Sequence, residues 1–253
     1  MRGIQNLPEV VAAKTRRIHE IVIHDSETIT QGNFTKIAIA DLERLFKLYD
    51  NVFFSGLLHK WFHEEKRSIS FRLSKRMTRA GGKTTCTRKH SQGKDNPKQV
   101  EVYEIAISTP LLFQTFKDVK RAIKVNGIEC QDRLEALQRI FEHELIHLLE
   151  MLAWRKSSCA ASNFKSLAAK IFAHTEVTHQ LVTQYERARI NFGIGVGEKV
   201  TFEYKGKQLG GFVNRITKRA TVLVENKKGM RYSDGKRYVK YYIPLSDLKK
   251  VSS

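Results

Sequence analysis

The spacing of apolar residues predicts both helices and strands in the first half of the chain. Between residues 37 and 54 apolar side chains recur three or four positions apart, which is the period of an amphipathic helix. Asp41 is a candidate cap at its start and Gly56 a candidate stop. The run SISFRLSKR alternates apolar and polar positions and predicts a strand. A glycine-rich turn, a strand, a polar loop and a better strand over residues 100–107 follow.

Three more helices are predicted in the middle of the chain. Thr109 and Pro110 would open a helix over LLFQTFKDVKRAI, with Thr109 as the cap and Pro110 at the first helical position. After a turn at Asn126-Gly127, a long helix is expected from Arg133 to about Trp154. A shorter helix, SNFKSLAAKIF, would be capped by Ser162.

The pattern changes at the glycine-spaced segment 193–197, which predicts a linker. Beyond it, short alternating runs are separated by turns, and Asp234-Gly235 is a hairpin signal. Four or five strands in so short a stretch predict a small all-β barrel of the SH3-like type over residues 196–253. Residues 1–35 have mixed patterning and are assigned to an N-terminal extension, which leaves a main domain over residues 36–192.

Charge narrows the class of partner. Lys and Arg number 45 against 26 Asp and Glu, a formal charge of +19 over 253 residues, which favours nucleic acid first and an anionic membrane surface second. We find neither a run of roughly 20 apolar residues nor a secretory signal pattern in the N-terminal residues. The three cysteines are widely spaced and odd in number, so we expect no disulfide framework and a cytoplasmic protein.

The long predicted helix contains FEHELIHLLEML at residues 141–152. His143 and His147 are four apart, so both imidazoles project from one face and can bind a single zinc ion. Glu144 lies beside them and can take a proton from a water in an open zinc position, as in metallopeptidases with the H-E-x-x-H motif. The alternative is a chance pattern on a buried helix, but unpaired polar groups on a buried helix cost folding free energy.

Four stretches occur in the order found in SprT-like proteins, the family that includes Spartan: LFKLYDNVFFSGLL, ISFRLSKRMTRAGGKTT, YEIAISTPLL and FEHELIHLLEML. The chain resembles that family over roughly residues 40–180. The resemblance implies an α+β, zincin-like metalloprotease domain in which the motif helix packs with a small antiparallel sheet. It also implies zinc ligands at His143 and His147, catalysis by Glu144, and cleavage of proteins crosslinked to DNA.

The third zinc ligand departs from the family pattern. The family supplies a histidine from an H-G-x-x-F motif, and alignment on Phe164 puts Ala160 at that position. The neighbouring Cys159 is our candidate, since a thiolate binds zinc well. The alternatives are a small buried cysteine before a helix, or ligands at His174 or His179; a helix of about ten residues would place His174 some 15 Å from Cys159. Glu150 either orients a metal ligand through hydrogen bonding, without binding the metal itself, or is a solvated carboxylate.

A basic segment of the chain is the candidate nucleic-acid-binding region. Between residues 72 and 98, Lys and Arg are numerous and there is a single acidic residue. This composition suits contacts with phosphates, but a solvated edge strand would show the same composition. The candidate DNA contacts are Arg72, Lys75, Arg76, Arg79, Lys83, Arg88 and Lys89. In the C-terminal segment, tyrosines among lysines could stack bases or simply fill a barrel core.

The sequence therefore predicts a cytoplasmic, DNA-associated zinc metallopeptidase that hydrolyses protein substrates. Two alternatives stay open. One is a non-catalytic nucleic-acid-binding protein with a structural zinc ion. The other is an interaction module that has lost its metal.

Overall fold

The computed structural model describes residues 6–64, 67–90 and 99–251, without the side chains of Glu64, Lys89, His90 and Gln99. The chain forms two compact units, the first ending at Leu181 and the second beginning at Val182. Both helices and sheets are present, so the α+β class is confirmed. No described helix is long and apolar enough to cross a bilayer.

Three helices begin the first unit: α1 (Pro8–Asp25), α2 (Ile39–Phe54) and α3 (Leu57–Glu64). Helix α1 is part of the packed first unit, whereas the sequence predicted a separate N-terminal extension over residues 1–35. It buries Val11, Ile18 and Val22 and packs against α2 and α5. Its apolar face would otherwise be exposed to water. Asp41 lies in the first turn of α2 and accepts a 2.7 Å hydrogen bond from the backbone N–H of Ala38.

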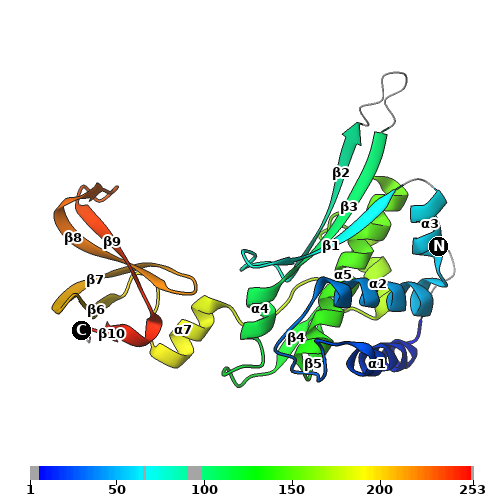
Figure 1. Cartoon of the computed structure of the whole chain (residues 1–253), viewed down its shortest axis with the longest axis horizontal. Helices are drawn as coiled ribbons and strands as arrows, with labels where there is room; N and C mark the ends of the chain where they lie inside the picture. The colour runs from blue at the N-terminus through cyan, green and yellow to red at the C-terminus, as the bar shows by residue number, and fades with distance from the viewer. Residues whose placement is uncertain (1–5, 65–66, 91–98, 252–253) are drawn as a thin grey trace. The chain divides into compact units, whose positions relative to one another are not determined.

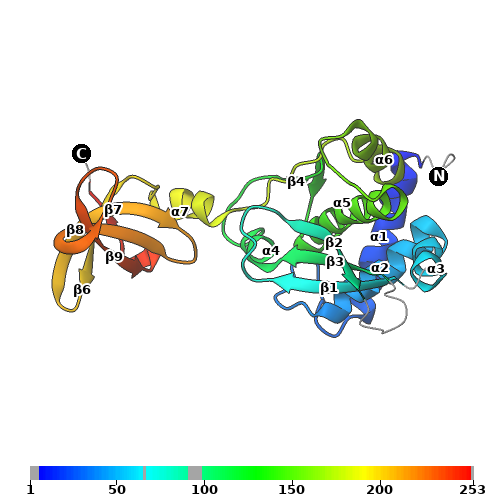
Figure 2. The ribbon, with the colours of Figure 1, turned by 90° about the horizontal axis from the view of Figure 1, so that it is seen from above.

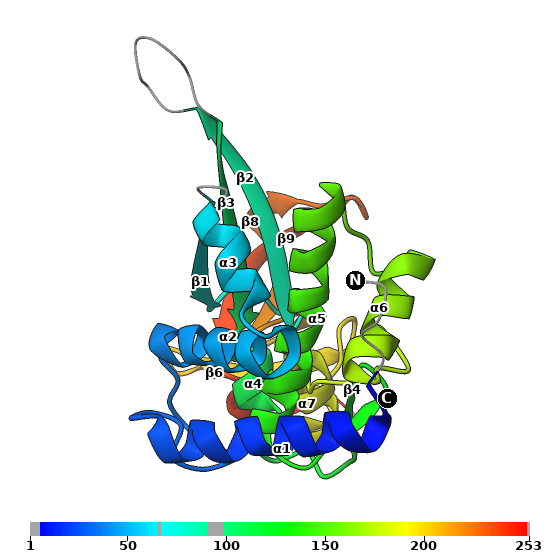
Figure 3. The ribbon, with the colours of Figure 1, turned by 90° about the vertical axis from the view of Figure 1, so that its right-hand side faces the viewer.

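The first sheet has three strands in the order β1-β3-β2: β1 (Ser68–Ser74), β2 (Gly82–His90) and β3 (Gln99–Ser108). Strand β2 pairs antiparallel with β3, but β1 pairs parallel with it, so the predicted antiparallel sheet is wrong in this respect. After β1 the chain crosses to the opposite edge of the sheet and forms β2 there. It then returns as β3, which lies between β1 and β2. Strand β2 is thus an edge strand, and it lies along α5 (Figures 1 and 3).

The helix predicted after Pro110 is much shorter than expected. Helix α4 covers Thr109–Gln114 only, and its cap is Ser108, whose hydroxyl accepts from the Leu111 N–H, rather than Thr109. A hairpin follows, made of β4 (Ile123–Val125) and β5 (Ile128–Cys130). Its turn is the predicted Asn126-Gly127, where both residues have positive φ as a tight hairpin requires.

The motif helix α5 spans Arg133–Trp154, as predicted, and α6 spans Ser162–Phe172. Asp132 caps α5 by accepting a 2.9 Å hydrogen bond from the Glu135 N–H. Ser162, by contrast, is the first residue of α6 and not its cap, which is Ala161. Helix α5 is buried over most of its surface and lies beside α6 (Figure 2), so its few polar side chains need partners.

The second unit contains α7 (Gln184–Phe192) and a five-stranded antiparallel sheet. The sheet order is β10-β6-β7-β8-β9, and a 3₁₀ turn at Leu245–Asp247 precedes β10. The predicted boundaries at 192 and 196 differ from this division. Ala188 of α7 and Ile194 are fully buried in the core of the unit, so the predicted linker is anchored to that core through Ile194, while Val196 is exposed. The strands are β6 (Lys199–Tyr204), β7 (Lys207–Ile216), β8 (Ala220–Arg231), β9 (Arg237–Ile243) and β10 (Lys249–Lys250).

Candidate metal centre

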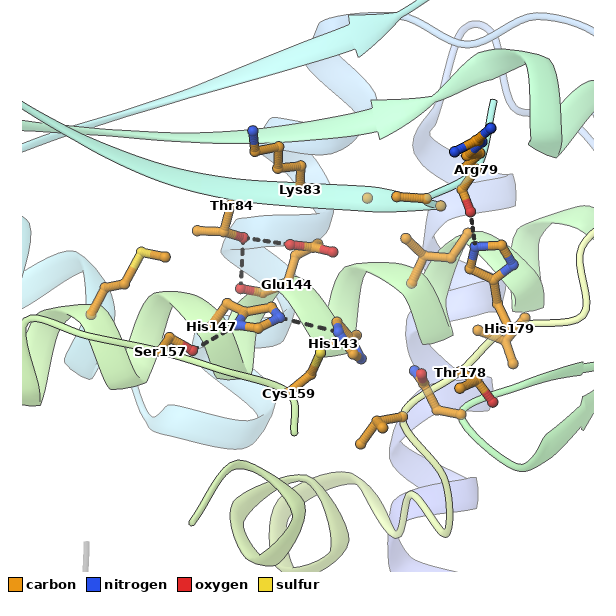
Figure 4. A pocket seen from close by; sticks show the side chains of 18 residues that line it. Arg79, Lys83, Thr84, His143, Glu144, His147, Ser157, Cys159, Thr178 and His179 are labelled. Carbon is orange, nitrogen blue, oxygen red and sulfur yellow. Dashed lines mark hydrogen bonds between the residues drawn. The ribbon is translucent and has the colours of Figure 1, made fainter. Parts of the chain in front are cut away.

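Helix α5 presents both motif histidines to a cavity of the first unit (Figure 4). The Nε2 atoms of His143 and His147 lie 3.2 Å apart. Phe164 of α6 is fully buried and packs against both rings, with centroid distances of 4.8 and 4.5 Å. The two imidazoles are thereby held in a fixed orientation. Two nitrogens on a tetrahedral zinc ion with bonds of about 2.05 Å would lie about 3.3 Å apart, so the observed spacing fits.

Cys159 joins the two histidines from the segment between α5 and α6. The chain reverses after α5, where Arg155 adopts a left-handed conformation, and a turn closes with the Ala161 N–H donating to the Ser158 carbonyl at 2.9 Å. The sulfur and the two imidazole nitrogens all lie within 4.8 Å of one another. In the described part of the chain this is the group of three His, Cys, Asp or Glu side chains close enough to share a metal ion. Two imidazoles and one thiolate are a donor set that suits zinc.

A polar chain behind His147 fixes which of its nitrogens faces the cavity. His147 Nδ1 lies 2.6 Å from Ser157 Oγ, and that hydroxyl donates to Glu150 Oε2 at 2.5 Å. Because the serine proton is used on the carboxylate, the serine oxygen accepts the Nδ1 proton and leaves a lone pair on Nε2. Glu150 is 3% exposed, so the alternative of a solvated carboxylate is wrong.

Burial keeps both imidazoles neutral, which is the form that binds metal. Desolvation lowers the pKa of His143 to about 3, with further contributions from His147, His174 and His179. Desolvation also lowers the pKa of His147 to about 4. Neither ring is therefore protonated at neutral pH, and no proton has to leave either imidazole before a cation binds.

Glu144 is 3% exposed and is held by the edge strand β2. The hydroxyl of Thr84 lies 2.7 Å from Glu144 Oε2 and 3.0 Å from its carbonyl oxygen. Burial raises the pKa of this carboxyl to about 7, although the Thr84 hydrogen bond opposes the rise. Gly82 is required here, because a Cβ at that position would come within 2.6 Å of Glu144 Oε1. A carboxyl group with a pKa near neutral can both accept and return a proton.

His174 and His179 occupy different environments, and the structure groups neither with the three candidate ligands. His174 is 4% exposed, and its Nε2 lies 2.8 Å from Oε2 of the fully buried Glu142. It therefore belongs to a buried polar network that also contains Tyr49 and Arg139. His179 instead lines the cavity, where its Nε2–H donates to the Arg79 carbonyl at 3.1 Å.

The cavity measures about 560 Å³ and is bounded by the β2 edge on one side and the motif helix on the other. Figure 4 shows Lys83 and Thr84 above Glu144, with Cys159 next to His143. The Arg79–Thr84 segment lines it, as do Met151 and His179. A peptide segment thus has space beside the three candidate ligands and Glu144.

The predicted DNA contacts are not gathered on one surface. Arg72 binds Glu104 at 2.9 and 3.0 Å on the sheet face turned away from α5. Lys83 pairs with Ala106, as Arg72 does, so its side chain lies on that same face, whereas Arg79 lines the cavity. Arg88 binds the buried Glu101, which Arg67 and Arg155 also contact. Lys75 and Arg76 follow β1, and the side chain of Lys89 lies outside the described residues.

Ser157, Glu150, Thr84 and Gly82 are the site residues that sequence reasoning missed or left open. For Ser157 no signal exists, since it is one serine in a polar turn. Gly82 belongs to the glycine-rich turn, which marks a close backbone approach without naming the group that approaches. Searches of protein-family models, curated proteins and solved structures returned no match to the chain.

Proposed function

We propose that this protein is a zinc-dependent metallopeptidase of the SprT-like type that hydrolyses proteins bound or crosslinked to DNA. The observation that carries the proposal is the convergence of three ligand atoms beside a buried glutamate at an open cavity. His143, His147 and Cys159 would hold the ion. Three protein ligands leave a fourth position for water or substrate, as catalytic zinc sites require.

The residues of the chain have separate roles in this reaction. Zinc, when bound, would supply Lewis acidity to the scissile carbonyl and acidify water. Glu144 accepts the proton of the attacking water and returns it to the leaving amine nitrogen, which its pKa near neutral permits. Ser157 and Glu150 keep the Nδ1 proton on His147 and so keep its Nε2 lone pair directed at the ion.

Other features support the zincin-like and SH3-like descriptions. A sheet edge strand runs along the motif helix, with its Thr84 on the motif glutamate. In the second unit, the strand order and the 3₁₀ turn before the last strand suit an SH3-like barrel. The formal charge of +19 supports a DNA-associated role, in the cytoplasm or on the nucleoid.

The alternative is a non-catalytic, zinc-containing nucleic-acid-binding protein. Cys159 favours it, because a thiolate ligand is commoner in structural than in catalytic zinc sites. The open cavity and Glu144 favour the enzyme. In a structural zinc site Glu144 would have no proton to transfer, and burying its carboxyl group would only destabilise the fold.

The experiment compares zinc-loaded wild type with Glu144→Gln on a protein crosslinked to a DNA oligonucleotide. We expect wild type to cut the protein, and Glu144→Gln to retain zinc and lose at least about 100-fold in rate. Glu129→Gln is the matched control, since Glu129 is exposed and does not line the cavity. No cleavage by zinc-loaded wild type would support the non-catalytic alternative, and equal cleavage rates for wild type and Glu144→Gln would contradict the proposed role of Glu144.

A further inference from the structure

The second unit has a row of lysine and apolar side chains on the sheet face opposite its core. Val200, Val213 and Val222 point into the core. Because side chains alternate along a strand, their neighbours Lys199, Phe212 and Leu223 point to the other face. The register places Lys199 opposite Phe212, Phe212 opposite Leu223, and Leu223 opposite Lys240. These four side chains, here called the outer row, cross four adjacent strands.

Both lysines of the outer row lie near an aromatic ring. The Lys199 ammonium lies 5.7 Å from the ring centroid of Phe212, and the Lys240 ammonium lies 5.8 Å from that of Tyr232. Phe212 is 40% exposed, a large fraction for a phenylalanine. Leu223 is buried between them and closes the gap in the surface. The row therefore offers one exposed aromatic ring, Phe212, with the Lys199 ammonium beside it and Lys240 two strands away.

A second row lies next to the first on the same face. After the bulge in β7, Arg215 pairs with Thr221, and Thr221 pairs with Tyr242 on β9. Tyr242 is 63% exposed and follows the outer row by two residues along its strand. Phe212 and Tyr242 lie two strands apart, roughly 10 Å in the hydrogen-bonding direction. Two exposed rings thus accompany three cations, Lys199, Arg215 and Lys240.

The charge of the unit suits a polyanion. From Glu198 onward it has 14 Lys and Arg against five Asp and Glu. On this face, the carboxylate of Glu225 is bound by Lys236 at 2.9 Å, and Glu203 lies four residues from Lys199 along β6. The outer row itself contains no acid.

We propose that this face binds single-stranded nucleic acid, with bases stacked on Phe212 and Tyr242 and phosphates bound by Lys199, Arg215 and Lys240. Aromatic rings on an open sheet stack on any unpaired base, whereas the bases of a duplex present no free face. The cations beside the rings neutralise the phosphates without reading sequence. The inference deepens the nucleic-acid part of the proposed function and is independent of zinc and of peptide cleavage.

The test uses the full chain and fluorescence anisotropy with two labelled strands of equal length. One is an oligodeoxythymidylate of about 20 nucleotides, which exceeds the site size of small β-barrel binders. The other is an abasic strand with the same number of phosphates. We expect wild type to bind the first at least about tenfold more tightly, because only that strand has bases to stack.

Variants then separate stacking from charge. Phe212→Ala/Tyr242→Ala should abolish the preference for bases and keep the salt dependence. Lys199→Ala/Lys240→Ala should keep the preference and reduce the slope of log K against log salt by about 1.4. Phe212→Leu/Tyr242→Leu retains apolar bulk and gives the same answer if the alanine variant does not fold. Tyr185→Ala is the control, as Tyr185 on α7 is a ring about as exposed as Phe212.

Three results would overturn the proposal. One is equal affinity of wild type for the two strands. Another is an unchanged base preference in the folded leucine variant. The third is binding to phosphatidylserine vesicles that exceeds binding to the oligonucleotide at the same salt concentration, which would assign the face to a membrane surface instead.

Discussion

Thr84 Oγ1 lies 2.7 Å from Oε2 of Glu144, and this hydrogen bond joins the edge strand β2 to the motif helix α5. It is buried, and it favours the ionised carboxylate against the desolvation that raises the pKa of Glu144 to about 7. The protonation state of the proposed catalytic base is therefore set from the sheet as well as from its own helix.

Thr84→Val should move the acid limb of the pH–rate profile to higher pH. Without the hydroxyl, the pKa of Glu144 rises further, so the ionised base is lost at a higher pH as the solution is acidified. We expect the midpoint of the acid limb of kcat/KM to move up by about one pH unit. Thr84→Ser keeps the hydroxyl and should keep the midpoint. An unchanged profile in Thr84→Val would show that the hydrogen bond does not tune the base.

Cys159→Ala should remove most of the bound zinc. In the proposed site the thiolate would supply the third ligand and a negative charge, so its loss would leave two neutral imidazoles, which bind zinc weakly. We expect near one zinc per chain in wild type and less than about a tenth of that in the variant, measured by plasma mass spectrometry after exchange into zinc-free buffer. Cys86→Ala is the control, since Cys86 is an exposed thiol outside the group of ligand atoms. Full zinc in Cys159→Ala would place the third ligand elsewhere.

Ser157→Ala should weaken zinc binding without removing a ligand. The Nδ1 proton of His147 loses its acceptor, and Glu150 loses its donor, so the imidazole is no longer fixed in the Nδ1–H tautomer. Losses of this kind cost about 10- to 100-fold in metal affinity. Competition with a chromophoric chelator measures the change.

Ser158→Ala is the matched control for this prediction, because the neighbouring Ser158 is exposed and contributes its backbone carbonyl to the turn. Equal zinc affinities for Ser157→Ala and Ser158→Ala would mean that the polar chain behind His147 has no effect on the metal.

Local patterns predicted the elements that carry the site. Helices α5 and α6 have the expected bounds because their apolar residues keep a helical period and turn residues flank them. The spacing of His143 and His147 was sufficient to predict that they share one helix face, and the structure brings the sulfur of Cys159, the candidate third ligand, within 4.8 Å of their nitrogens. These features depend on residues close together in the sequence.

The rest depends on contacts between distant segments. The parallel pairing of β1 with β3 follows from the path of the chain around the sheet, which no local pattern records. Helix α1 belongs to the core of the first unit, and its contact with α5 spans more than 100 residues, as in the His19–Asp132 pair. The Thr84–Glu144 contact is likewise a meeting of two elements, each predictable, whose juxtaposition is not.

His174→Leu should destabilise the first unit and leave its zinc content unchanged. The change leaves the buried carboxylate of Glu142 without one of its donors, which costs about 2 to 4 kcal/mol of unfolding free energy. Urea unfolding followed by tryptophan fluorescence reports on this unit, because Trp61 and Trp154 both lie in it. His174→Gln keeps an amide donor and should recover part of the loss. A fall in zinc content at full stability would instead make His174 a ligand.

The contact between α1 and α5 should make the stability of the first unit depend on pH. His19 Nε2 lies 2.9 Å from Oδ2 of Asp132, the cap of α5, and this hydrogen bond raises the pKa of His19 above its usual value of 6.5. Because the folded state binds the proton more tightly, the stabilisation is complete below pH 6.5 and is lost as the pH rises through the folded-state pKa.

His19→Gln should therefore lower the free energy of unfolding more at about pH 5.5 than at about pH 8.5, by about 1 kcal/mol. His24→Gln is the control, since His24 lies on the same helix and its contact with Asp25 is exposed to solvent. Urea unfolding of both variants at the two pH values, followed by tryptophan fluorescence, makes the comparison. An equal cost of His19→Gln at both would mean that the His19 proton does not stabilise the capped end of the motif helix.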